Sequence, residues 1–221
     1  MKIIPIIFFI SSQVHGALVV SDSRLLWPKG VLPYVINSDT PFRNKIQIAI
    51  NELNKFKIVK VVPRTNENNY IYFTTNSSPW CESSVGMQGG AQAIRLTTDC
   101  SAADILHELM HALGFHHEQQ RPDRNKYVHI YSGALNRSND HDIQHEALMI
   151  GTYDIFSIMH NSNHVKVMTL VPGSPFLNHH ESGYSGNDIL TIENIQTGDF
   201  SLNPLRSLSK GDQEALRKMY N

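Results

Sequence analysis

Residues 107–117 read HELMHALGFHH. Leucine, methionine and alanine side chains surround the histidines, so a helix here would be apolar over most of its circumference and therefore buried. Upstream, Ser101 and Asp104 have the spacing of a capping box, with Asp in place of the usual Glu or Gln. Gly114 is a natural stop, because glycine readily adopts the left-handed conformation that ends many helices. The sequence predicts a buried helix that begins near Ser101 and ends at Gly114.

The spacing of the histidines indicates a metal site. His107 and His111 are four residues apart, so on a helix they project from one face and can share an ion. At Gly114 the chain can turn sharply and bring His117 back as a third ligand. Three neutral imidazoles with one open position are typical of catalytic zinc, whereas structural zinc is usually closed by four protein ligands. We expect one Zn²⁺ per chain on these three histidines.

Glu108 directly follows the first expected ligand. A carboxylate there can take a proton from a zinc-activated water that attacks a peptide carbonyl, and can pass that proton to the leaving amine. We therefore predict a zinc-dependent endopeptidase with Glu108 as general base. The His-Glu-x-x-His pattern alone also arises by chance in helices, and a purely structural protein with a buried histidine cluster is the alternative. Gly114 and His117 at fixed offsets favour the catalytic interpretation.

The first residues are typical of a secretory signal peptide. Met1 and Lys2 precede an apolar run over residues 3–10, and small or polar residues follow as far as Gly16. The run is much shorter than the ~20 apolar residues that span a bilayer. We predict a signal peptide over residues 1–16, cleavage that leaves Ala17 as the new N-terminus, and a secreted, extracellular protein.

The two cysteines agree with export. An isolated pair such as Cys81 and Cys100 usually forms a disulfide in an oxidising compartment, and two free thiols are the alternative. Closing a loop of this length stabilises a fold by roughly 3 kcal/mol in the chain-entropy model. Asn76 and Asn136 each begin a tripeptide that can accept N-glycosylation, which is a weak signal because such tripeptides are common.

The remaining pattern indicates one α+β unit. The 221 residues suit one compact domain, and a net charge of −1 gives no electrostatic reason to expect nucleic acid or an anionic membrane as partner. Pro33 suggests that its strand is an edge strand or starts irregularly. Residues 119–203 are polar and should be loop-heavy. Apolar spacing predicts strands over residues 31–36, 58–62 and 70–74 and within 85–96, and helices over 42–56 and 210–219.

The chain also resembles a known family. Residues 107–124, HELMHALGFHHEQQRPDR, match every fixed position of HExxHxxGFxHExxRxDR, the signature of the astacin family of metzincin zinc endopeptidases. The resemblance implies an astacin-like catalytic domain over residues 17–221. Its N-terminal lobe, 17–117, would hold a twisted mixed sheet and helices and end at the third zinc ligand. Its C-terminal lobe, 118–221, would be irregular, with the family's Met-turn and a terminal helix. Further likeness lies at residues 27–34, 62–65, 81–100, 157–160, 208–212 and 219–220.

The resemblance implies roles for residues beyond the histidines. Met159 would lie in the Met-turn and pack beneath the ligands. Glu118 would reach, through water, toward the buried mature N-terminus. Cys81 and Cys100 would form one of the family's two disulfides. Structural ion pairs are implied for Arg121, Asp123 and Arg124.

The expected partner is a protein or peptide substrate in an extended cleft. Residues 86–96 would supply the edge strand at its upper rim, where a peptide adds as a further strand through main-chain hydrogen bonds. We expect no nucleic-acid partner, no membrane contact after signal cleavage, and a monomer.

Three departures from the family pattern qualify these expectations. Asn161 stands where the family has a tyrosine that is a fifth ligand and an oxyanion donor, which leaves a weakly active or inactive zinc- and peptide-binding module as the alternative function. The family's other disulfide lacks its first cysteine, because Ile58 stands there, so packing of Leu216, Met219 and Tyr220 should hold the C-terminal helix. Only about ten residues separate Ala17 from the first strand motif, so we expect signal peptidase alone to produce the active form.

Overall fold

The structure is a computed structural model that describes residues 16–38, 40–75, 77–78, 80–130, 142–160, 168–170 and 207–221. Its centre is a mixed sheet with the strand order β3-β2-β4-β6-β5. The strands β2, β3, β4 and β6 run parallel to one another, and β5 pairs antiparallel with β6. Their bounds are β2 Val31–Ile36, β3 Lys60–Pro63, β4 Tyr70–Thr75, β5 Glu82–Ser83 and β6 Ala91–Leu96.

Pro33 lies on β2, which is an inner strand of the sheet. The prediction of an edge strand at this proline is therefore wrong. The register explains how the sheet accepts it. Pro33 pairs with Val62 of β3, whereas the pairing of β2 with β4 begins one residue later, at Tyr34. Because proline lacks a backbone donor, it fits where the strand is paired on one side alone.

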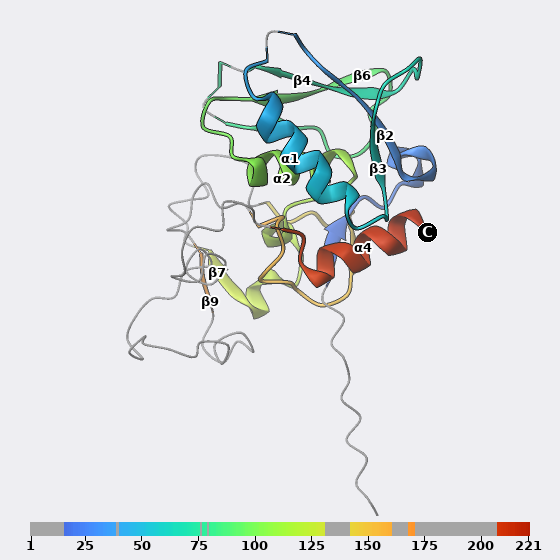
Figure 1. Ribbon diagram of the computed structural model, residues 1–221. Coiled ribbons are helices and arrows are strands. Elements are labelled where there is room, and N and C mark those ends of the chain that lie inside the picture. Colours follow the sequence, from blue (N-terminus) through green and yellow to red (C-terminus); the bar gives the residue numbers. More distant parts are fainter. Residues whose placement is uncertain are drawn as a thin grey trace, which may run out of the picture.

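Two helices cover one face of the sheet (Figure 1). They are α1, Arg43–Asn54, and α2, Ala102–Ala112, and they pack against each other. The apolar positions that predicted α1 from the sequence are all buried, which confirms the periodicity. The core between sheet and helices includes Leu32, Ile46, Ile50, Leu53, Ile71, Phe73, Ile94, Ile105 and Leu109.

Short elements and a terminal helix complete the described chain. Strand β1, Ala17–Val19, pairs with β8, Leu148–Ile150, and β7, Val128–Ile130, pairs with β9, Met168–Leu170. Helix α4, Lys210–Tyr220, lies beneath α1 and α2 in Figure 1 and contacts β1. Single 3-10 turns lie at η1 Ser23–Leu25, η2 Pro28–Gly30, η3 Glu118–Gln120 and η4 Arg124–Lys126. Within the described part of the chain, no helix combines the length and hydropathy that crossing a membrane requires.

Candidate metal centre

Helix α2 supplies the first two candidate ligands. It begins where the sequence predicts: Ser101 Oγ accepts the backbone N–H of Asp104, and the Asp104 carboxylate accepts that of Ser101. This reciprocal cap satisfies two donors at the helix start. The helix is buried over most of its surface, so His107 and His111 are carried on a rigid element inside the protein.

A sharp turn after α2 brings the third candidate back. Gly114 has a φ of +99°, a conformation that residues with a Cβ rarely adopt. The following residues run beside β1: Val20 N–H donates to the Gly114 carbonyl at 2.8 Å, and His116 N–H donates to the Leu18 carbonyl at 2.9 Å. The N-terminal strand thus guides the chain into His117.

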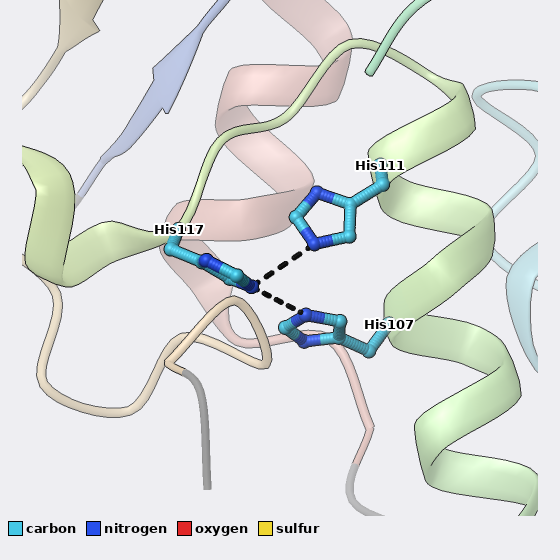
Figure 2. A group of neighbouring side chains, drawn as sticks. All are labelled: His107, His111 and His117. Carbon is cyan, nitrogen blue, oxygen red and sulfur yellow. Dashed lines mark hydrogen bonds between the residues drawn. The ribbon is translucent and has the colours of Figure 1, made fainter. Parts of the chain in front are cut away.

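The three histidines converge on one point (Figure 2). His117 Nε2 lies 3.1 Å from His107 Nε2 and 3.1 Å from His111 Nε2. Zn–N bonds of about 2.05 Å at tetrahedral angles would separate ligand nitrogens by about 3.3 Å. The three imidazoles therefore fit a zinc ion with little movement. His107 and His111 come from α2 and His117 from the segment after Gly114, as Figure 2 shows.

Main-chain carbonyls fix the orientation of the two helical rings. His107 Nδ1 lies 2.8 Å from the Ile158 carbonyl oxygen, and His111 Nδ1 lies 2.7 Å from that of Phe115. A carbonyl oxygen can only accept, so each Nδ1 carries the proton and each Nε2 keeps its lone pair for a metal. Sequence reasoning missed both partners, because a backbone carbonyl has no sequence signature.

The other predicted site residues lie close in the chain or in the fold. Glu108 is buried on α2 next to His107. Met159 is fully buried in the turn over residues 157–160, and its carbonyl accepts the N–H of Glu118, which directly follows His117. Asn161 lies outside the described residues, as do Asn76 and Asn136.

The segment after His117 carries buried charges. Glu118 Oε1 accepts the Asp154 N–H at 2.8 Å and lies 3.5 Å from Arg121 Nη1. Burial raises the pKa of the Glu118 carboxyl well above its usual value, and the Arg121 guanidinium opposes that shift. Arg121 forms a two-point ion pair with Asp123, at 2.9 Å and 3.0 Å, which confirms that pair. Arg124 donates to the Gln119 carbonyl.

The predicted disulfide joins Cys81 to Cys100, whose Cα atoms are 6.1 Å apart. It connects the segment just before β5 to the start of α2. Strand β5 was not predicted from the sequence. It lies outside β6 and pairs with Ile94 and Arg95, so residues 91–96 do not form the outermost strand as expected.

Taken together, the sheet, the helix with its two histidines and the returning third histidine define a zinc-metallopeptidase type of domain. Comparison with known proteins agrees. The profile of the peptidase family described as "Astacin" matches residues 19–221. The chain therefore belongs to the astacin family.

Individual relatives share part of the chain. It is 37% identical over 122 residues to zinc metalloproteinase nas-12 of Caenorhabditis elegans, covering 53% of this chain and 31% of that protein. It is 34% identical over 170 residues to embryonic protein UVS.2 of Xenopus laevis, covering 69% of this chain and 31% of that protein. The chain thus spans less than a third of the length of either relative.

A solved structure shows the same fold. High choriolytic enzyme 1, a hatching enzyme zinc-protease from medaka (Oryzias latipes), aligns with a TM-score of 0.64 at 23% identity, covering 93% of this chain and 98% of that one. The structural match supports the α+β astacin-like fold. The identity is too low to support a shared substrate.

Proposed function

We propose that this protein is a secreted zinc-dependent endopeptidase, with zinc on His107, His111 and His117. The convergence of three imidazole Nε2 atoms from α2 and the returning chain carries the proposal. Donation of Nδ1–H to main-chain carbonyls by the two helical rings supports it further, because it presents both Nε2 lone pairs to the same centre. One Zn²⁺ per chain and a monomer are part of the proposal.

The roles of the residues follow from their positions. Zinc, when bound there, supplies a Lewis acid that lowers the pKa of a water molecule and polarises a peptide carbonyl. Glu108 would take a proton from the attacking water and deliver it to the leaving amine. Its buried place beside His107 on a rigid helix supports this role, since a general base must be held in hydrogen-bond reach of its proton.

The substrate would lie along the outer side of β6. Strand β5 pairs there with Ile94 and Arg95, and residues 91–93 lie beyond that register. An extended peptide could add to this half of β6 through main-chain hydrogen bonds. We therefore propose protein or peptide substrates bound in an extended conformation.

Cleavage after Gly16 is proposed to produce the mature protein, with lobes over residues 17–117 and 118–221. Ala17 begins β1 and is fully buried, and β1 contacts η3, whose first residue is Glu118. A new N-terminus at Ala17 would therefore lie inside the protein near a buried carboxyl group. N-terminal sequencing of the secreted protein should begin at Ala17, and a start well beyond it would contradict the proposed processing.

The central experiment measures zinc and proteolysis on the same samples. The secreted protein should contain one zinc per chain by mass spectrometry and cleave casein or gelatin. Glu108→Gln should retain zinc but lose activity by about 10²–10⁴-fold, the usual range for a general base. Glu146→Gln, which changes an exposed glutamate, is the matched control and should be fully active. Absence of stoichiometric zinc, or full activity of Glu108→Gln, would refute the proposal.

A weakly active or inactive zinc- and peptide-binding module is the second candidate, favoured by Asn161. Loss of one oxyanion donor can cost about 10²–10³ in rate. Asn161→Tyr should then raise casein cleavage by a factor in that range. If wild type binds zinc and peptides but shows no cleavage, the second candidate is the correct one.

A further inference from the structure

Helix α4 forms hydrogen bonds near both of its ends with segments that hold or lead to the candidate ligands. Asp212 lies in its first turn and Tyr220 is its last residue. Eight residue steps along the helix place them about 12 Å apart. The two contacts are linked through main-chain groups to different histidines, and neither was expected from the sequence.

The first contact begins at the Asp212 carboxylate, which is fully buried. Its Oδ1 accepts the Ser157 hydroxyl at 2.6 Å, and its Oδ2 accepts the Ile158 N–H at 3.0 Å. Ser157 Oγ in turn accepts the Met159 N–H at 3.0 Å. Asp212 therefore holds the peptide groups on both sides of Ile158, one directly and one through a hydroxyl.

This arrangement fixes the direction of the Ile158 carbonyl, which is the hydrogen-bond acceptor of His107. The Ile158 carbonyl and the Met159 N–H belong to one planar peptide group, so fixing the N–H fixes the carbonyl. That carbonyl accepts from His107 Nδ1 at 2.8 Å. The Asp212 carboxylate thus sets the direction of the imidazole through two intervening groups.

The second contact closes the end of α2. The last carbonyls of a helix have no partner within it and need donors from elsewhere. Tyr220 OH donates to the Leu113 carbonyl at 2.9 Å, and Trp27 Nε1 donates to that of Ala112 at 2.8 Å. Leu113 is the C-cap of α2 and directly precedes Gly114, where the chain turns toward His117.

Side chains of α4 also pack on that turn. A Cβ placed at Gly114 would lie 3.2 Å from Met219 Cε. Ala215 and Leu216 are fully buried, so the helix is anchored in the core between its two ends. A rigid helix held in this way can keep the contacts of Asp212 and Tyr220 at a fixed position relative to each other.

We propose that α4 is a brace for the metal centre, in which Asp212 positions His107 and Tyr220 positions His117. The proposal rests on the proposed function, because it takes these histidines as zinc ligands. Groups that orient the ligands of a metal typically change affinity or activity by about 10–100-fold when they are removed. The brace therefore acts on zinc retention and on turnover rather than on substrate binding.

The test compares Tyr220→Phe and Asp212→Asn with wild type and with Lys218→Ala. Tyr220→Phe removes one hydroxyl, Asp212→Asn keeps the size of the side chain, and Lys218→Ala changes an exposed residue of α4. Zinc release to an excess of a fluorescent chelator should be about 10-fold faster in the first two variants and unchanged in the third. The visible absorption of the Co²⁺-substituted forms should shift in the first two, and kcat should fall with little change in KM.

Other outcomes separate the brace from the proposed function. If wild type holds no zinc, the proposed ligands are wrong, and the proposal that α4 is a brace is refuted together with them. If wild type holds zinc and Tyr220→Phe releases it at the wild-type rate with an unaltered Co²⁺ spectrum, the brace is refuted, whether or not the melting temperature has fallen. Tyr220→Phe decides the question even if Asp212→Asn fails to fold.

Discussion

Replacing Gly114 by alanine tests how tightly the turn between the second and third proposed ligands is packed. The residue has a φ of +99°, and a non-glycine residue held in such a region costs about 1–3 kcal/mol. The new Cβ would also lie 2.9 Å from Val20 Cγ2 and 3.2 Å from Met219 Cε. Overpacking of this kind typically costs roughly 1–3 kcal/mol more. We therefore expect a total loss of about 4 kcal/mol in the free energy of unfolding.

Gly89 provides a matched control, because it shares the backbone strain without the crowding. Its φ is +84°, and no atom of the described residues lies within 4 Å of a Cβ placed there. Gly89→Ala should therefore lose only the strain, about 2 kcal/mol. The difference of about 2 kcal/mol between the two variants measures the packing around Gly114.

Urea denaturation at a fixed excess of free zinc gives both free energies, because bound zinc contributes to stability by mass action. Zinc content is measured in parallel. Gly114→Ala should also bind zinc more weakly, since relief of the contact with Val20 moves the chain that leads to His117. If Gly114→Ala is no less stable than Gly89→Ala and retains zinc as wild type does, the turn is not packed as described.

Three further predictions concern charge, the disulfide and zinc. Burial, and then the charge of Asp154, raise the pKa of Asp212 to about 6 from 3.8, so the folded state binds more protons than the unfolded chain between these values and stability falls as pH rises. Relative to Asp212→Asn, wild type should lose about 1 kcal/mol of unfolding free energy between pH 5 and pH 7, and a gain in urea denaturation would contradict this. Replacing Cys81 and Cys100 together by serine should cost roughly 3 kcal/mol in the same assay, and an unchanged midpoint would show that the disulfide adds nothing. Zinc should leave as pH falls below the ordinary histidine pKa of about 6.5, because imidazole binds metal only when neutral, and metal retained after dialysis well below that pH would argue against histidine ligands.

The sequence predicted those features that depend on local spacing. The capping box at Ser101, the apolar periodicity of α1 and α4, and the four-residue interval between His107 and His111 all act within a few turns of helix. The isolated pair of cysteines predicted the disulfide, and the likeness to a family signature then added the ion pair between Arg121 and Asp123. The helical features and the ion pair are present in the fold because local geometry alone is enough to bring their atoms together.

The contacts that the sequence did not predict join distant segments. Trp27 and Ala112 are 85 residues apart, and Tyr220 and Leu113 are 107 residues apart. In each pair the acceptor is a main-chain carbonyl, which every residue type possesses. Neither periodicity nor spacing can single out such an acceptor, so these contacts follow only from the folded arrangement. Strand β5 was missed for a related reason, because two residues are too few to show an alternating pattern.

Reliance on main-chain acceptors has a consequence for how this site tolerates substitution. The carbonyls of Ile158 and Phe115 orient the rings of His107 and His111 whatever side chains those two positions carry. Side-chain donors, in contrast, depend on residue type. Tyr220 donates a hydrogen bond through its hydroxyl, and phenylalanine at that position would lack it. The family likeness makes residue 161 an oxyanion position, so a change at Asn161 should alter turnover, whereas a change at Tyr220 should alter both turnover and zinc retention.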